Sequence, residues 1–181
     1  TRETIIRAEA MAPCILWIDE IDKGFGGDAR SDGGTSQRVL ASLLTWMAEK
    51  KSSVFVIATA NAIDKLPPEL LRKGRFDEIF FLDLPKSEER FTILDLHLKK
   101  RRPNYNFHLS TIVDRTNGYS GAELEQAVIE AMHYSFSEKR EITERDLIKA
   151  VSELVPLSRT AKEQIDLLKQ WSSTGRARLA S

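Results

Sequence analysis

A run of five apolar residues that ends in two acidic residues constrains the fold of this chain more than any other feature. The run Cys14–Ile18 is followed directly by Asp19 and Glu20. A short apolar run without alternation is typical of a strand that is buried on both faces of a parallel sheet. Ligands of open α/β sheets bind at the carboxyl ends of the strands. The sequence therefore predicts that Asp19 and Glu20 lie at a ligand-binding edge.

Two more apolar runs follow the first, and helical patterns separate them. We expect strands over Val54–Ala58 and Ile79–Leu82, a helix over Ser36–Lys50, and a short helix after the turn at Pro67-Pro68. Strands that alternate with helices imply parallel pairing in a three-layer α/β sheet. Residues 1–85 are therefore expected to form an α/β part.

The pattern changes after Pro85, where strand signals end and four or five amphipathic helices follow. The longest of them is expected to begin at Ser120–Glu123, which has the pattern of a capping box. We expect an all-helical domain over residues 86–171, and a small, polar, flexible tail over residues 172–181.

Charge and composition exclude several classes of protein. Lys plus Arg and Asp plus Glu each number 27, so the formal net charge is +0, and no overall field attracts nucleic acid. No apolar run approaches the roughly 20 residues of a membrane-spanning helix. The single cysteine, Cys14, rules out a disulfide framework and fits a reducing compartment. We expect no nucleic-acid partner and no membrane span.

The paired carboxylates suit a divalent cation and an activated water. One carboxylate can hold Mg²⁺, usually through its waters, and the other can orient or deprotonate the attacking water. Asn61 ends the second strand, where its amide could align a water or sense a γ-phosphate. Simpler interpretations stay open, because acids can merely end a strand at a solvated loop and Asn61 can be a turn residue.

Two arginines precede the third expected strand. Arg72 and Arg75 flank Gly74, and guanidinium groups suit bidentate contact with phosphate. A solvated turn, or an ion pair with Asp77, is the alternative.

Four stretches of the chain, in this order and spacing, resemble the AAA clade of the AAA+ ATPases. They are Cys14–Asp22, Val56–Asn61, Leu70–Asp77 and Gly118–Leu124, and the resemblance extends over residues 1–154. The details are most similar to AAA proteins encoded in algal plastid genomes and in cyanobacteria. The resemblance implies an ATP hydrolase with ATP and Mg²⁺ as cofactors, acting as a homo-hexamer on a protein substrate or adaptor. It also implies a location in the chloroplast stroma or the cyanobacterial cytoplasm.

The resemblance assigns roles to individual residues. Asp19 and Glu20 match the Walker B pair, for Mg²⁺ and for the hydrolytic water, and Asn61 matches the sensor-1 position. Arg72 and Arg75 match the arginine fingers, which in the family reach the nucleotide of the neighbouring subunit. Such a finger is typically worth about 10³–10⁵ in rate.

Further positions match residues near the sugar and the base of the nucleotide. His97 falls where the clade often has a histidine near the ribose, and Gly121 and Ala122 match the small residues beside the adenine. A position on a helix surface for His97, and a capping role for Gly121 and Ala122, are alternatives. The loop Gly24–Gly34 falls at the second pore loop of family hexamers, or is a flexible connection.

The chain contains no G-x-x-x-x-G-K-[ST] motif, and so lacks the backbone cradle and the lysine that bind nucleotide phosphates. By family analogy the sheet order is 5-1-4-3-2, and the three expected strands match strands 3, 4 and 5. Strand 1, which carries the P-loop, would lie between strands 4 and 5. We expect an incomplete parallel AAA+ sheet followed by a helical lid domain, in a longer protein with roughly 70 or more residues upstream.

The leading hypothesis is an AAA-clade ATPase that couples ATP hydrolysis to remodelling of a macromolecular partner, the 181 residues alone being inactive. The alternative is a non-catalytic protein-binding or regulatory module built on an AAA+ fragment. A third interpretation is a metal-dependent hydrolase that uses Asp19, Glu20 and Asp22 directly, which would need further ligands.

Overall fold

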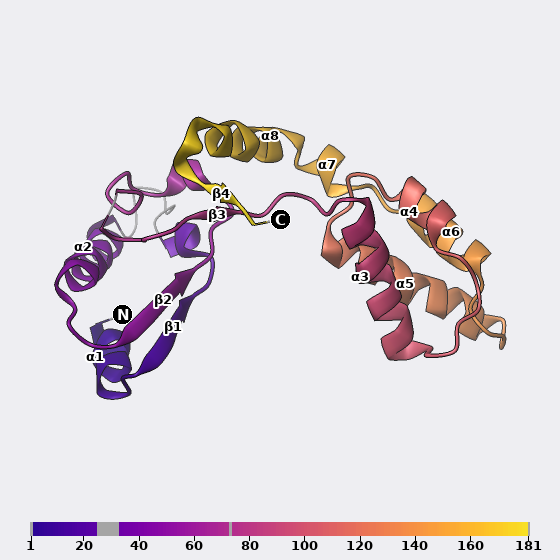
Figure 1. The fold of residues 1–181 in the computed structure, drawn as a ribbon, viewed down its shortest axis with the longest axis horizontal. Coiled ribbons are helices and arrows are strands. Elements are labelled where there is room, and N and C mark those ends of the chain that lie inside the picture. Colours follow the sequence, from indigo (N-terminus) through magenta and orange to yellow (C-terminus); the bar gives the residue numbers. More distant parts are fainter. Residues whose placement is uncertain (1, 25–32, 73, 181) are drawn as a thin grey trace. The chain divides into compact units, whose positions relative to one another are not determined.

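The fold is described by a computed structural model, which covers residues 2–24, 33–72 and 74–180 (Figure 1). The chain divides into two compact units, one over residues 1–80 with 175–178, and the other over residues 81–174 with 179–181. Each unit is described by itself. No helix in the covered ranges combines the length and the apolar character needed to cross a membrane.

The first unit contains a two-stranded parallel sheet. Strand β1 (Cys14–Ile18) pairs with β2 (Val54–Ala58) along its full length, with Ile18 opposite Ala58. Both strands have the bounds expected from the sequence. Because the strands are parallel, their carboxyl ends lie at the same edge, and the residues that follow them are neighbours.

Two helices cover one face of this sheet. They are α1 (Arg2–Ala10) and α2 (Gly33–Glu49), and Figure 1 shows them beside the strand pair. Ile5 of α1 and Leu43 of α2 are buried in a cluster against which Ile18 of β1 packs. The face of β1 that carries Ile18 therefore packs against the two helices.

The other face of the sheet is exposed, which corrects the expectation of a strand buried on both faces. Ile15 and Trp17 are 66% and 61% exposed, and Phe55, opposite Ile15 on β2, is 67% exposed. Successive side chains of a strand point to opposite faces. The helices of the first unit pack against one face alone, so the expected three-layer arrangement does not form within the described residues.

The third strand is shorter than expected and pairs elsewhere. Strand β3 spans Phe80–Phe81 rather than residues 79–82, and its partner is β4 (Arg178–Leu179). It is therefore not a neighbour of β2, as expected if a strand is missing between the two. The predicted fold class is confirmed, because a short parallel sheet is followed by a mainly helical unit.

Turns replace the short helix that was expected after Pro68. A short 3₁₀-helix, η2 (Ile63–Lys65), comes first. The backbone N–H of Leu70 then donates to the Pro67 carbonyl at 2.9 Å, and that of Leu71 to the Pro68 carbonyl at 3.2 Å. Both bonds join residues three positions apart, as in single turns, and the described residues that follow do not continue them into a helix.

The second unit is helical apart from a short strand segment. Helix α5 packs against α3 and α6, and α4 packs against the same two helices. Several side chains between these helices are 0% exposed, among them Leu94, Leu98, Leu124 and Leu147. The helices are α3 (Ser87–Arg101), α4 (Ser110–Arg115), α5 (Gly121–Ser137), α6 (Glu144–Glu153), α7 (Leu157–Thr160) and α8 (Lys162–Trp171).

The predicted capping box is present at the start of α5. The backbone N–H of Glu123 donates to Ser120 Oγ at 3.3 Å, and the backbone N–H of Ser120 donates to Glu123 Oε2 at 2.7 Å. These two bonds satisfy donors that have no partner within the helix. At the other end of the unit, a helical turn (Ser172–Arg176) leads into β4, within the tail that the sequence predicts to be flexible.

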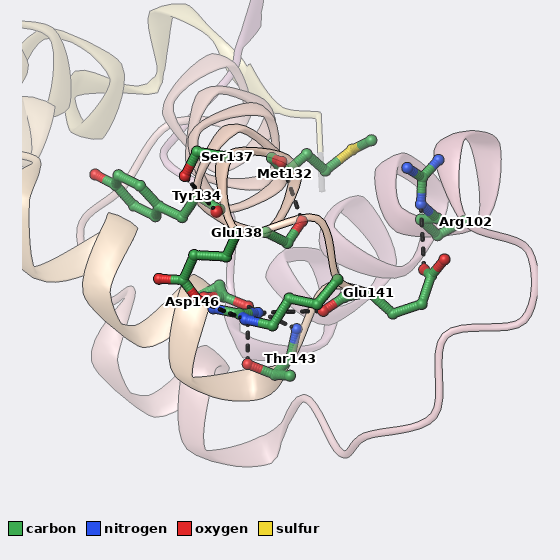
Figure 2. Close-up of polar contacts among 10 residues, drawn as sticks. Arg102, Met132, Tyr134, Ser137, Glu138, Glu141, Thr143 and Asp146 are labelled. Carbon is green, nitrogen blue, oxygen red and sulfur yellow. Dashed lines mark hydrogen bonds and ion pairs between the residues drawn. The ribbon is translucent and has the colours of Figure 1, made fainter.

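The start of α6 is fixed by one carboxylate (Figure 2). The backbone N–H of Thr143 donates to Asp146 Oδ2 at 2.8 Å, and the Arg140 guanidinium donates to both Asp146 oxygens at 2.6 and 2.7 Å. These bonds, chiefly those from Arg140, lower the pKa of Asp146 to about 2. Figure 2 also shows the ion pair between Arg102 and Glu141, which joins the end of α3 to this region.

Candidate active site

The carboxyl ends of β1 and β2 bring three of the predicted site residues close together. Asp19 and Glu20 follow β1, and Asn61 follows β2. Asn61 Nδ2 donates to Glu20 Oε1 at 3.3 Å. The acid pair and the amide therefore form one cluster at the edge where ligands of α/β sheets bind.

Thr59 lies within this cluster and was missed by the sequence analysis. Its hydroxyl oxygen accepts a hydrogen bond from the Glu20 backbone N–H at 2.9 Å, and the hydroxyl donates to Asp19 Oδ1. The strand register contains the signal that could have found it. Because Ile18 is opposite Ala58, the next residue of each strand, Asp19 and Thr59, must also be neighbours.

Glu20 has an unusual backbone conformation. Its φ is +48°, in the left-handed region that costs a residue other than glycine about 1–2 kcal/mol. Such conformations persist where the surroundings fix them, and they concentrate at functional sites. The flanking backbone is held by a bond from the Ile21 N–H to the Thr59 carbonyl at 2.8 Å and one from the Lys23 N–H to the Glu20 carbonyl at 2.9 Å.

The two oxygens of the Glu20 carboxylate have different partners. Oε1 accepts from Asn61, and Oε2 lies 2.6 Å from Lys23 Nζ. The hydrogen bond to Glu20, followed by the attraction of its charge, raises the pKa of Lys23. The Lys23 side chain is exposed, and exposed ion pairs of this kind are weak and exchange with water. Oε2 is therefore held only by a weak, exposed ion pair within the described residues, whereas Oε1 is bonded to Asn61.

Asp22 is the third acid of this segment and is 4% exposed. It lies in a short 3₁₀-helix, η1 (Ile21–Gly24). Its oxygens accept from the backbone N–H groups of Asn61 and Ala62, at 3.3 and 3.1 Å. Because both of its oxygens accept hydrogen bonds, Asp22 supports the loop after β2 rather than binding a metal. The metal-dependent hydrolase interpretation, which needs Asp22 as a ligand, is weakened by this.

The exposed carboxylate of Asp19 fits the role expected of a Mg²⁺ ligand. Thr59 holds Oδ1, and no described residue hydrogen-bonds to Oδ2. Mg²⁺ in proteins typically combines one or two carboxylates with several waters. Within the covered ranges, no group of three or more His, Cys, Asp or Glu residues is arranged to hold a metal by itself. The donor set therefore fits a cation that keeps most of its waters, or that has phosphate oxygens in place of some of them.

The two arginines lie on the turn before β3. Arg72 is exposed and Arg75 is half-buried, and Arg75 Nη1 lies 3.5 Å from the Gly74 carbonyl oxygen. Among the described residues, neither arginine contacts the acidic cluster and neither forms an ion pair with Asp77. Neither guanidinium group therefore has an acidic partner among the described residues.

The remaining predicted residues belong to the second unit. His97 on α3 lies 3.1 Å, through Nδ1, from Glu125 Oε1 on α5, and Arg101 Nη2 donates to the same oxygen at 2.7 Å. The Arg101 hydrogen bond is the main cause of a lowered pKa of Glu125. Gly121 and Ala122 are the first two residues of α5. The expected pore loop, Gly24–Gly34, lies mostly outside the described residues.

Family comparisons agree with this arrangement of an α/β segment and a helical unit. Residues 1–84 match the ATPase family associated with various cellular activities (AAA), and residues 106–149 match the AAA+ lid domain. The chain belongs to the AAA family, and it carries part of an AAA domain followed by an AAA+ lid.

Individual relatives support the same assignment. The chain is 53% identical to the uncharacterized AAA domain-containing protein ycf46 of Pyropia yezoensis, and 50% identical to the protein of that name from Guillardia theta. Each alignment covers 99% of the chain but only 37% and 36% of the relative, respectively. The chain is also 37% identical to the proteasome-activating nucleotidase of Saccharolobus solfataricus, over 84% of the chain and 40% of the relative. It thus spans little more than a third of the ycf46 relatives.

Proposed function

We propose that the protein to which this chain belongs is an AAA-clade ATPase that couples ATP hydrolysis to remodelling of a macromolecular partner. The observation that carries the proposal is the contact of Asn61 Nδ2 with the Glu20 carboxylate, beside Asp19, at the carboxyl edge of two parallel strands. An acid pair and an amide in contact at this edge are the groups that hydrolysis of a phosphoanhydride needs around its water and its cation.

Each member of the cluster has a distinct task in this proposal. Mg²⁺, when bound with ATP, neutralises the charge that develops on the phosphates. Asp19 orients the waters of the cation through Oδ2. Glu20 orients the attacking water and accepts its proton. Asn61 holds the Glu20 carboxylate in the direction of the water through the 3.3 Å hydrogen bond.

The other predicted residues complete the site between subunits and beside the nucleotide. We infer that Arg72 and Arg75 reach the nucleotide of a neighbouring subunit in a homo-hexamer, which is supported by the lack of an ion pair between either arginine and an acid in the part of the chain that the structure describes. His97, Gly121 and Ala122 would lie near the ribose and the adenine. The contact of His97 with Glu125 supports this role, because it engages Nδ1, on one edge of the ring, and not Nε2.

The 181 residues contain no P-loop motif, and we propose that another part of the full-length protein supplies it. We therefore propose that hydrolysis belongs to the full-length protein and that the segment alone is inactive. A protein substrate or adaptor is the proposed partner. A chloroplast stroma or cyanobacterial cytoplasm is the proposed location, supported by about 50% identity to the algal ycf46 proteins.

Replacement of the proposed catalytic carboxylate tests this function. In the full-length protein, Glu20→Gln should leave ATP binding within about threefold of wild type and lower the rate of phosphate release by at least about 100-fold. The matched control is Glu3→Gln, which removes an exposed carboxylate on α1 that pairs with Arg7. Equal hydrolysis by Glu20→Gln and wild type, or no hydrolysis by the wild type with Mg²⁺ and ATP, would contradict the proposal.

A further inference from the structure

We propose that Thr59 is a positioning residue, whose hydroxyl holds the Asp19 carboxylate and the Glu20 backbone in the arrangement that hydrolysis requires. The inference rests on the proposed function and extends it to a residue to which the resemblance assigns no role. Thr59 directly follows β2 and is half-buried between the two loops.

The hydrogen-bond chemistry of the hydroxyl fixes the direction of both bonds. The backbone N–H of Glu20 can only donate, so Thr59 Oγ1 must accept there, at 2.9 Å. A hydroxyl has one proton to donate, and that proton is directed to Asp19 Oδ1. Thr59 therefore engages one Asp19 oxygen in a hydrogen bond, and the other, Oδ2, is left to meet the waters of a cation.

The main chain of Thr59 reinforces what the hydroxyl does. Its N–H donates to the Ile18 carbonyl at 3.0 Å, and its carbonyl accepts from the Ile21 N–H at 2.8 Å. One residue thus contacts four consecutive residues, 18–21, at the end of β1. Glu20, with a φ of +48°, lies in the middle of this clamp. Since left-handed residues persist where several contacts fix them, the clamp explains why the acid pair bends away from the strand at this point.

Loss of the hydroxyl should affect the chemical step more than the binding of nucleotide. The Glu20 N–H would lose its acceptor and the Asp19 carboxylate would be free to rotate, so both acids would shift relative to the water. Misplacement of catalytic groups by about 1 Å can cost about 100-fold in rate. Within the described residues, the hydrogen bonds of Thr59 all go to residues 18–21, so its loss should act on the acid pair rather than on the residues proposed to bind the ribose and the adenine.

The test compares Thr59→Val and Thr59→Ser in the full-length protein. Valine keeps the shape and removes the hydroxyl, whereas serine keeps the hydroxyl. Thr59→Val should lower kcat by about 10- to 100-fold with KM for ATP within about twofold of wild type, and Thr59→Ser should restore kcat to within about threefold. Amide hydrogen exchange in residues 15–24 should be faster in Thr59→Val than in wild type or Thr59→Ser. If Thr59→Val does not fold, Thr59→Ala provides the same comparison.

Thr92→Val is the matched control, because Thr92 is exposed on α3 and its hydroxyl donates only to the Glu88 carbonyl of its own helix. Unchanged kcat in Thr59→Val, failure of serine to restore kcat, or a raised KM without a fall in kcat would each overturn the inference. If Glu20→Gln stops hydrolysis while Thr59→Val does not change it, the proposed function stands and this inference alone fails. If the wild-type protein hydrolyses no ATP, both fail.

Discussion

The carboxylate of Asp22 joins the loops that follow two different strands. It accepts hydrogen bonds from the backbone N–H groups of Asn61 and Ala62, at 3.3 and 3.1 Å, and its side chain is almost completely buried. The backbone of Asn61 is thereby fixed at the point from which its side chain reaches Glu20. Asp22 therefore supports the geometry of the acid pair without contacting a ligand itself.

Removal of this carboxylate should lower both stability and turnover. In Asp22→Ala, the backbone N–H groups of Asn61 and Ala62 lose their acceptor at a partly buried position, which we expect to reduce the free energy of unfolding by about 1–3 kcal/mol. Asp22→Asn keeps one acceptor oxygen and should have a smaller effect. Urea denaturation and phosphate release by the full-length protein measure the two consequences. Asp64→Ala, which removes an exposed carboxylate from η2, is the control, and an equal effect of both alanine variants would contradict the role of Asp22.

Gly118 should tolerate no side chain, for two separate reasons. Its φ is +82°, which favours glycine, and an added Cβ would lie 2.2 Å from Ser158 Oγ at the start of α7. The backbone N–H of Ser158 also donates to the Gly118 carbonyl at 3.2 Å, so α7 cannot move away without losing that bond. We expect Gly118→Ala to reduce the free energy of unfolding by clearly more than the roughly 1 kcal/mol of a left-handed alanine.

Gly175 provides a control for that variant. Its φ is +77°, but nothing lies within 4 Å of an added Cβ, so Gly175→Ala should show the conformational cost alone. The double variant Gly118→Ala with Ser158→Gly should recover the part of the loss that is due to the clash. Urea denaturation of the four proteins gives the comparison. Equal losses of unfolding free energy in Gly118→Ala and Gly175→Ala would mean that the clash with Ser158 does not contribute to the loss in Gly118→Ala.

The ion pair of Asp146 with Arg140 should make stability depend on pH in acid. The Arg140 hydrogen bonds hold the pKa of Asp146 at about 2, below its usual 3.8. The group thus contributes stability that is present above about pH 4 and is lost as the pH falls toward 2, worth about 2 kcal/mol in all. The difference in free energy of unfolding between wild type and Asp146→Asn should be constant from pH 5 to 7 and about half as large at pH 3. A difference that does not change with pH would contradict this assignment.

Local sequence patterns predict the elements better than they predict what covers them. The bounds of β1 and β2 and the capping box at Ser120 follow from residues close together in sequence, and the structure has them as expected. The exposure of Ile15 and Trp17 depends on which distant segments reach the sheet, which an apolar run does not reveal.

The same limit applies to the site. Asp19, Glu20 and Asn61 could be found from their places after apolar runs. The roles of Thr59 and Asp22 follow only from the register of β1 with β2, which brings the loops after the two strands into contact. The pairing of β3 with β4 likewise joins residues that are about a hundred positions apart, which no local pattern indicates.

Subunit mixing separates an arginine that acts on its own site from one that acts on a neighbour. If Arg75 serves the adjacent subunit, full-length Arg75→Ala and Glu20→Gln proteins should each hydrolyse ATP poorly, because every site lacks either the finger or the catalytic acid. A mixed assembly contains some sites with both groups intact, so mixing should restore a substantial part of the rate. The same holds for Arg72→Ala. Activity after mixing that does not exceed the average of the separate proteins would mean that the arginine and the acid of a site come from the same subunit, or that the arginine takes no part in catalysis.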